Sequence, residues 1–269
     1  MHFRDRHAMT LAAQIDHLVI VADSLDQGVE WCESTLGVTP GPGGVHPLMG
    51  THNRLLRIDS PAMPCAYLEI IAIDSSAAQP AHKRWFDMDD AELKKAVRQK
   101  PRFVHFVAST PDAQAAQKAL RGLGIERGPL LQAERPTAAG LLRWKISVRD
   151  DGQRLFYGGL PTLIEWGDTH PAEAMPPSGL VLQSLRMSHP RPFDLVAAYA
   201  AIGLAVDPFA LSLSKGLYDG RRASTSSART GGVVSARTGG IVEVVEGPPN
   251  LTATLDTPRG LVTIESSGT

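Results

Sequence analysis

The sequence has few cysteines, no excess of charge and no long apolar run, and each absence excludes a class of protein. Two cysteines among 269 residues, Cys32 and Cys65, are too few for a secreted disulfide framework. We interpret both as reduced thiols in apolar surroundings. The 27 basic and 28 acidic residues leave a formal net charge of −1, which argues against a nucleic-acid or membrane-surface protein.

No stretch approaches the roughly 18 apolar residues that a membrane helix requires. The charged segment before Asp16 contains no apolar core of signal-peptide length. With the reduced cysteines, these features predict a cytoplasmic protein that binds neither nucleic acid nor membrane. At about 150 residues per domain, the length allows one large domain or two small ones.

The chain does contain a recurring order of strand, helix and further strands. Apolar β-branched runs predict strands, and apolar residues at helical spacing that end at Gly37 predict a helix. We expect strands at 15–22, 54–58 and 66–73, a helix at 25–36, and a Gly/Pro-rich turn at 41–44. These elements form a first βαβββ unit over residues 14–75.

The same order returns after a short linking helix near 92–98. Thr110 and Pro111 have the signature of a helix cap followed by proline at the first helical position. The expected elements are strands at 103–108, 129–133, 141–148 and 162–166, and a helix between Thr110 and Gly124. A second βαβββ unit over 101–170 therefore completes a predicted domain at 14–175.

Ionisable residues interrupt the apolar strands at matching places in the two units. His17 and His105 lie in the first strand of each unit, and Glu69 and Glu165 in the last. The alternation of a strand predicts that His17 shares a face with Ile15 and Val19, Glu69 with Tyr67 and Ile71, and His105 with Phe103 and Val107. A buried carboxylate must be paired, protonated or bound to a cation.

Two imidazoles and two carboxylates are suitable ligands for Zn²⁺, Ni²⁺, Co²⁺, Fe²⁺ or Mn²⁺. The repeated pattern therefore predicts one divalent metal ion, of open identity, held between the units by His17, Glu69, His105 and Glu165.

A third, partial βαβββ-like unit is expected over 180–269. Its elements are strands at 180–188, 242–245, 251–255 and 261–264 and a helix at 193–202. A low-complexity insertion at 209–240, which contains an eight-residue tandem repeat, interrupts this unit. Ser184 stands where the second unit has His105, so we interpret the third unit as a structural or dimerising addition, which leaves a homodimer open.

The segments that carry this pattern resemble the vicinal oxygen chelate superfamily, which includes glyoxalase I, extradiol dioxygenases and bleomycin-resistance proteins. Residues 15–19, 46–55, 67–69 and 163–168 are similar to the glyoxalase-like domain. The resemblance covers about residues 14–175. It implies an α+β fold in which paired βαβββ units form a cupped mixed sheet around a metal site, here with a C-terminal partial unit.

In glyoxalase I relatives, the first and last strands of each copy supply the metal ligands, which by position are His17, Glu69, His105 and Glu165. The resemblance implies a metal-dependent lyase or isomerase that acts on a small substrate with vicinal oxygens, in which Glu165 or Glu69 moves the proton. Two alternatives remain. One is a non-catalytic small-molecule-sequestering protein of the bleomycin-resistance type, and the other is an Fe(II) extradiol-type dioxygenase.

Further candidates are assigned by position. His52, Asn53 and Arg54 precede a strand and are candidate substrate-binding residues, with turn hydrogen bonding as the alternative. Trp144 and Trp166 are candidates for a pocket wall, with core packing as the commoner role of a tryptophan in a strand. His46, His82 and His170 are expected in surface loops.

Overall fold

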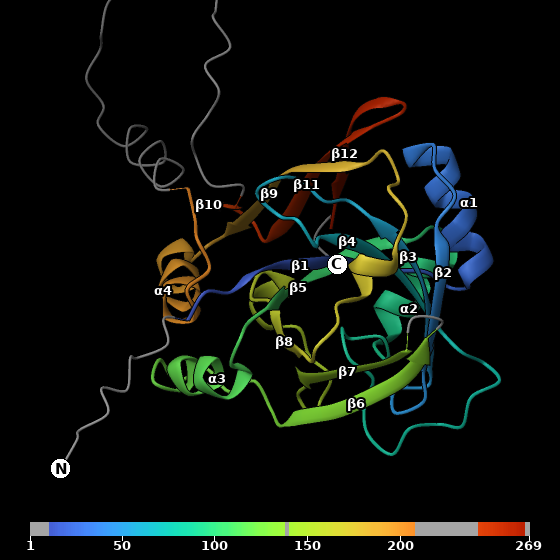
Figure 1. Ribbon diagram of the computed structural model, residues 1–269. Helices are drawn as coiled ribbons and strands as arrows, with labels where there is room; N and C mark the ends of the chain where they lie inside the picture. The colour runs from blue at the N-terminus through green and yellow to red at the C-terminus, as the bar shows by residue number, and fades with distance from the viewer. Residues whose placement is uncertain (1–10, 138–139, 208–241, 267–269) are drawn as a thin grey trace, which may run out of the picture.

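The structure is a computed structural model that describes residues 11–137, 140–207 and 242–266. It contains one curved mixed sheet with the strand order β2-β3-β4-β1-β5-β8-β7-β6 and a second sheet with the order β10-β9-β11-β12 (Figure 1). Helices pack against both faces of this curved sheet. The predicted α+β fold with a cupped mixed sheet is confirmed.

The first unit contains β1 (Gln14–Val21), α1 (Leu25–Leu36), β2 (Gly41–His46), β3 (Thr51–Arg57) and β4 (Tyr67–Ile73). After α2 (Ala91–Gln99), the second unit contains β5 (Arg102–Ser109), α3 (Ala113–Arg121), β6 (Leu130–Thr137), β7 (Gly140–Ser147) and β8 (Thr162–Trp166). The C-terminal part contains β9 (Val181–His189), α4 (Pro192–Ile202), β10 (Val242–Glu246), β11 (Asn250–Thr257) and β12 (Gly260–Glu265).

The two units join through their first strands at the centre of the curved sheet. Strand β1 pairs in parallel with β4 and antiparallel with β5, so Val19 lies opposite both Glu69 and His105. Strands β1, β4 and β5 are buried along almost their whole length. Residues predicted from separate units therefore share one central region of the sheet.

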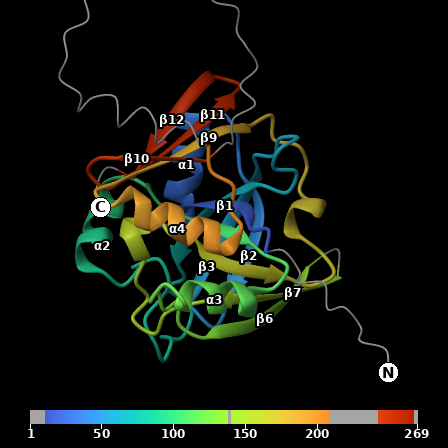
Figure 2. The ribbon, with the colours of Figure 1, turned by 90° about the vertical axis from the view of Figure 1, so that its left-hand side faces the viewer.

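Two hydrophobic clusters fill the two faces of this sheet. On the helix side, Leu18 and Ile20 of β1 pack with α1, α3 and the second sheet. On the concave side, Val19 and Val21 pack with residues of the α2 region and of β7. Helices α3 and α4 lie side by side (Figure 2). The concave face is the side left for a binding pocket.

The ends of the helices follow from capping chemistry, with one correction. Helix α1 begins after Ser24, whose side chain accepts a hydrogen bond from the Gln27 amide, and ends at Gly37 in the left-handed conformation with φ of 76°. The N-cap of α3 is Asp112, which accepts a hydrogen bond from the Ala115 amide. The prediction of Thr110 as that cap was wrong, because Asp112 supplies the acceptor two residues later.

The expected turn at 41–44 is instead the start of β2, an edge strand paired with β3. Edge strands tolerate proline and glycine because one side of the strand has no partner to bond. The register shifts between Pro42 and Val45, which is a bulge or irregularity in the ladder. Strand β2 brings the backbone of Gly43 close to Asn53 of β3.

The C-terminal part has the predicted order of strand, helix and three strands. Its sheet order differs from that of the first unit, because β9 pairs in parallel with β10 and lies between β10 and β11. In the first unit, the corresponding order is β1-β4-β3-β2. The predicted insertion at 209–240 lies outside the described residues.

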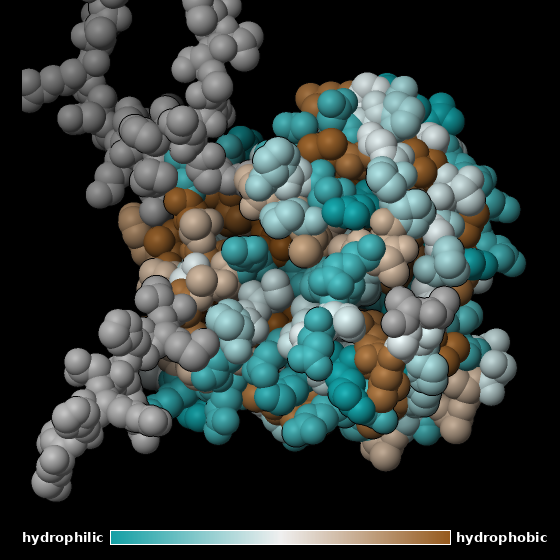
Figure 3. Space-filling view, viewed as in Figure 1, coloured by the Kyte–Doolittle hydropathy of each residue, from teal (hydrophilic) through white to brown (hydrophobic). Residues whose placement is uncertain are grey.

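On the face shown in Figure 3, hydrophilic residues cover most of the described surface, and hydrophobic residues gather beside α4. Cys32 is buried and Cys65 is exposed, so the expectation of apolar surroundings fits only Cys32. Among the described residues, no helix is long and apolar enough to cross a membrane.

Candidate functional site

A bulge in β1 brings the side chains of Asp16 and His17 into contact. Ile15 pairs with Ala108 and His17 with Val107, so Asp16 is an extra residue on β1. Ile15 consequently packs in the helix-side cluster while His17 lines the concave pocket. The predicted shared face of Ile15 and His17 was wrong for this reason.

Asp16 is a buried carboxylate with three side-chain partners. Its Oδ1 lies 2.6 Å from His17 Nδ1, and its Oδ2 accepts hydrogen bonds from Trp166 Nε1 at 2.8 Å and His170 Nε2 at 3.0 Å. Burial alone raises the pKa of Asp16, but the hydrogen bonds from His17 and His170 outweigh burial and hold this pKa well below its usual range. Asp16 is therefore ionised.

An ionised Asp16 fixes the tautomer of His17. A carboxylate only accepts hydrogen bonds, so His17 Nδ1 carries a proton and donates it. The other ring nitrogen, Nε2, then projects toward Glu69 Oε2 at 3.6 Å. Tyr67 stacks on the His17 ring with centroids 4.5 Å apart. The imidazole is thus held from one edge and one face, and its free edge points into the pocket.

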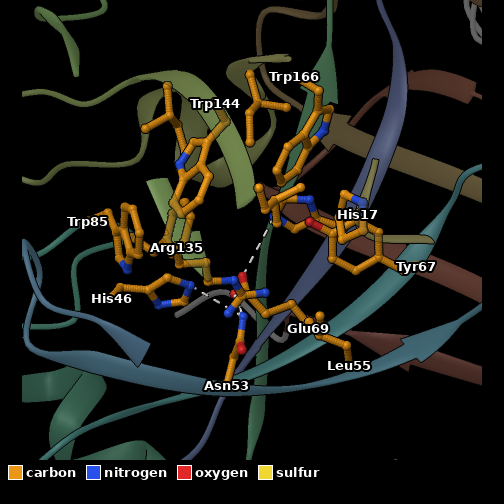
Figure 4. Close-up of a pocket in the computed structure, with 15 residues that line it drawn as sticks. His17, His46, Asn53, Leu55, Tyr67, Glu69, Trp85, Arg135, Trp144 and Trp166 are labelled. Atoms are coloured by element: carbon orange, nitrogen blue, oxygen red, sulfur yellow. Dashed lines mark hydrogen bonds and ion pairs between the residues drawn. The ribbon is translucent and has the colours of Figure 1, made fainter. Parts of the chain in front are cut away.

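Glu69 is positioned by Asn53 on the neighbouring strand (Figure 4). Asn53 Nδ2 donates to Glu69 Oε1 at 2.6 Å, and Asn53 Oδ1 accepts from the Gly44 amide at 2.7 Å. The second carboxylate oxygen of Glu69 faces His17. The buried carboxylate therefore has a donor on one oxygen and an imidazole on the other.

His46 is buried in the pocket wall, so its expected place in a surface loop was wrong. Its Nδ1 lies 3.1 Å from Thr51 Oγ1, and its Nε2 lies 3.4 Å from Asn53 Nδ2. Burial, and then the positive charge of Arg135, lower the pKa of His46 to about 3. His46 is therefore a neutral member of the site.

Aromatic side chains form the remaining walls. Trp85, Trp144 and Trp166 line the pocket, together with Phe86 and Tyr67. Trp144 and Trp166, for which the sequence left a pocket wall or the core open, have ring centroids 5.8 Å apart and close one side of the pocket (Figure 4). Three of the four tryptophans of the chain therefore surround one cavity.

The structure brings His17 and Glu69 together but keeps His105 away from them. His105 Nδ1 contacts the Gly158 carbonyl at 2.9 Å, and His105 Nε2 accepts a hydrogen bond from the Thr162 amide at 3.1 Å. Burial lowers the pKa of His105 well below its usual value. Phe103 and Val107 were both predicted to share a strand face with His105. A bulge at Val104 turns Phe103 to the helix side of the sheet, so only Val107 lies on the same face as His105. His105 is a neutral core residue with both nitrogens occupied.

Glu165 lies on the opposite face of β8 from the pocket. Ile164 and Trp166, its neighbours in the strand, line the pocket, so alternation sends Glu165 outward. There its Oε1 pairs with Lys145 Nζ at 2.6 Å and its Oε2 accepts from the Ala113 amide at 2.9 Å. Glu165 therefore anchors the first turn of α3, whose exposed amides favour a negative charge.

The same alternation separates the three candidate substrate-binding residues. Asn53 lines the pocket, whereas His52 and Arg54 on either side of it in β3 do not. Sequence reasoning missed Asp16, Arg135 and Trp85. Asp16 had a signal, since it is a second polar residue beside His17 in an apolar strand. Arg135 and Trp85 had none, because only the tertiary fold brings them to β1 and β4.

The resemblance to glyoxalase I relatives implies a divalent metal, and the donor set does not fit one. Among the described residues, no three His, Cys, Asp or Glu side chains lie close enough together to hold a metal ion. His17 and Glu69 supply two donors, while His105 and Glu165 have other partners. We therefore derive no chemical step through a metal.

Comparisons with known proteins agree with the fold. No curated protein matches the sequence. A hypothetical protein from Staphylococcus aureus has a TM-score of 0.51 at 17% identity, over 71% of this chain and 75% of that chain. At this identity the likeness shows the fold alone.

Smaller structures are also similar. A variant of Streptomyces coelicolor methylmalonyl-CoA epimerase in complex with 2-nitronate-propionyl-CoA has a TM-score of 0.37 at 18% identity, over 60% of this chain and 99% of that chain. The Mycobacterium tuberculosis methylmalonyl-CoA epimerase has a TM-score of 0.36 at 18% identity, over 62% and 96%.

The sequence matches the glyoxalase-like domain over residues 15–203. This range contains the whole curved sheet, the pocket, β9 and α4. The chain therefore belongs to the glyoxalase-like domain family of the vicinal oxygen chelate superfamily.

Proposed function

We propose that the protein is an enzyme of lyase or isomerase type that moves a proton on a small substrate with vicinal oxygens. The observation that carries the proposal is the alignment of Asp16, His17 and Glu69, with 2.6 Å between Asp16 Oδ1 and His17 Nδ1 and 3.6 Å between His17 Nε2 and Glu69 Oε2. Two proton-transfer groups that face one aromatic pocket are the elements of general acid–base catalysis.

The Asp16–His17 contact defines what the imidazole can do. With its Nδ1 proton held by Asp16, neutral His17 offers a lone pair at Nε2, and protonated His17 offers an N–H there. The Asp16 carboxylate keeps the ring in place. His17 can therefore accept a proton and return it at the same atom.

Glu69 is the second proton-transfer group. It removes a proton from the substrate carbon next to a carbonyl, the bonding electron pair moves to the carbonyl oxygen, and His17 donates its Nε2 proton to that oxygen. Reversal of these transfers on the other carbon–oxygen position completes an isomerisation with no net gain of protons. The Asn53 hydrogen bond holds Glu69 in place, and the tryptophan walls limit the water that competes for the proton.

The test is hydrogen exchange in deuterium oxide with a panel of 2-oxoaldehydes and 2-hydroxyketones, followed by proton NMR. Protein-dependent loss of a carbon-bound proton signal is the expected result. Glu69→Gln and His17→Gln should each reduce the exchange rate by about 100-fold or more.

Matched controls make this test specific. Glu165→Gln changes the same residue type on the outer face of β8, and His52→Gln changes a histidine of β3 outside the pocket. Both should keep most of the exchange activity. Equal losses in Glu165→Gln and Glu69→Gln, or exchange that no variant reduces, would contradict the assigned pair.

The second candidate function is non-catalytic binding of a small molecule, which the three tryptophans of the pocket favour. Aromatic walls with few convergent polar groups are typical of binding pockets. Under this alternative, ligands quench tryptophan fluorescence in the wild type and in Glu69→Gln alike, and none of them exchanges a proton.

A further inference from the structure

Arg135 is a cation without a counterion in the pocket. Its Nε and Nη1 atoms are buried and have no hydrogen-bond partner, and it is the one arginine in the described ranges with two such nitrogens. The side chain lies among His46, Asn53 and Glu69 (Figure 4). A buried guanidinium with unused donors is costly, because each donor has lost water without gaining an acceptor.

Glu69, which lines the pocket, and Asp16 behind His17 are carboxylates that already have other partners. Asp16 binds His17, Trp166 and His170. Glu69 binds Asn53 through one oxygen and faces His17 with the other. No ion pair joins Arg135 to either carboxylate within the part of the chain that the structure describes. Arg135 Nε and Nη1 therefore have no acceptor among the described residues.

The backbone of β2 makes room for this guanidinium. A Cβ added at Gly44 would lie 1.8 Å from Arg135 Nη1, so any larger residue at this position displaces the Arg135 head group. The Gly44 amide also holds Asn53, which in turn holds Glu69. Arg135 and the proton-transfer pair are therefore fixed by the same strand.

A second unused donor lies in the same pocket. Trp85 Nε1 is buried and has no hydrogen-bond partner. Trp85 lines the pocket beside His46, with ring centroids 5.1 Å apart. A guanidinium and an indole N–H both donate hydrogen bonds to anionic oxygens, and the guanidinium matches the planar geometry of a carboxylate.

We propose that Arg135, supported by Trp85, binds a carboxylate group of the substrate, so that the substrate is a small 2-oxo or 2-hydroxy carboxylic acid. The inference rests on the proposed function and adds the class of substrate. In such a molecule, the carboxylate and the adjacent oxygen are the vicinal oxygens. Binding of the carboxylate at Arg135 leaves the proton-bearing carbon, which is C2 of a 2-hydroxy acid or C3 of a 2-oxo acid, for the His17–Glu69 pair, which removes the proton and returns it to the same carbon.

The test measures binding separately from turnover. Pyruvate and 2-oxobutyrate are titrated into the protein while tryptophan fluorescence is recorded, with pyruvamide as a neutral probe of nearly the same shape. Pyruvate should bind at least about tenfold more tightly than pyruvamide, because a charged hydrogen bond is lost with the amide. Arg135→Gln should weaken pyruvate binding by at least about tenfold and leave pyruvamide binding nearly unchanged.

Three further variants test whether weaker binding comes from the Arg135 head group or from a loss of folded structure. Arg143→Gln changes an exposed arginine of β7 that pairs with Glu134, and it should leave pyruvate binding unchanged. Arg135→Lys keeps the charge and should retain part of the affinity. Gly44→Ala keeps the guanidinium but displaces it, and it should weaken pyruvate binding as well. The thermal midpoint of each variant reports whether the fold is intact.

The outcomes distinguish this inference from the proposed function. Equal affinity for pyruvate and pyruvamide, or unchanged pyruvate binding in a folded Arg135→Gln protein, overturns the carboxylate subsite. Proton exchange on neutral ketones alone, still dependent on His17, likewise overturns the subsite while the proposed function stands. Arg135-dependent binding of pyruvate without any proton exchange supports the subsite and contradicts the proposed function.

Discussion

Trp166 donates a hydrogen bond to Asp16 across a distance of 2.8 Å, and this contact joins the last strand of the second unit to the first strand of the first unit. Strands β8 and β1 are not neighbours, because β5 lies between them. The same carboxylate holds His17. The orientation of the candidate proton-transfer residue therefore depends on contacts from both units.

Asp16→Asn should reduce the rate of proton exchange by about 100- to 10,000-fold, with a much smaller change in KM. The amide removes the negative charge beside His17, and it can donate to Nδ1 and so place the ring in the other tautomer. Trp166→Phe removes one hydrogen bond but keeps the carboxylate, so its loss of rate should be smaller. Steady-state kinetics of both variants, with circular dichroism as the check of folding, measure this difference. Equal losses would show that the Asp16 charge is not the important property.

Protein stability should fall as the pH is lowered from 6.5 to 5, in part because of His46. Its pKa of about 3 in the folded protein lies below the ordinary value of 6.5, so the unfolded chain takes up a proton that folded His46 does not. The contribution of neutral His46 to the free energy of unfolding is fully present above about pH 6.5 and is lost as the pH falls toward 3. Between pH 6.5 and pH 5, the lowered pKa of folded His46 reduces the free energy of unfolding by about 2 kcal/mol.

Urea unfolding at pH 6.5 and pH 5 tests this prediction. The difference in unfolding free energy between the two pH values should be smaller in His46→Gln than in the wild type by about 2 kcal/mol. An equal difference in both proteins would contradict the burial of neutral His46.

The order of elements was predictable because it depends on local patterns. Apolar runs, helical spacing and Gly37 predicted β1 and α1 almost to the residue. The edge strand β2 was missed because glycine and proline indicate a turn unless a neighbouring strand, here β3, pairs with them. Local sequence carries no information about that partner.

The site was predicted only in part, because strand bulges and register are set by tertiary pairing. His17 and Glu69, predicted as ligands of one metal ion, lie on adjacent parallel strands with 3.6 Å between His17 Nε2 and Glu69 Oε2. Regular alternation gave no sign of the bulge that turns Asp16 toward His17. It also gave no sign that His105 would bind the Gly158 carbonyl, 53 residues away in the chain.

Gly43→Ala should disturb the site and lower stability by about 1–3 kcal/mol. An added Cβ would lie 2.1 Å from the Asn53 carbonyl oxygen and 2.2 Å from Asn53 Oδ1, so β2 and β3 must separate. Gly41→Ala is the matched control on the same strand, because its Cβ would meet only the Leu55 carbonyl oxygen at 3.4 Å. Thermal unfolding of both variants measures the difference, and equal midpoints would contradict the close approach of Gly43 to Asn53.

Divalent metal ions should bind this protein weakly, because the described residues offer two neighbouring donors, His17 and Glu69, where tight protein sites use three or four. Calorimetric titration of the protein with Zn²⁺, Ni²⁺, Co²⁺ and Mn²⁺, and anaerobically with Fe²⁺, should give no tight stoichiometric binding. Proton exchange should persist in the presence of a chelator. His105→Gln provides the decisive comparison, since this residue belongs to the ligand set implied by glyoxalase I relatives but binds Gly158 and Thr162 here. Tight binding of one metal ion per chain, lost in both His17→Gln and a folded His105→Gln protein, would restore the four-ligand centre. It would also require the His105 ring to leave its two hydrogen bonds when the metal binds.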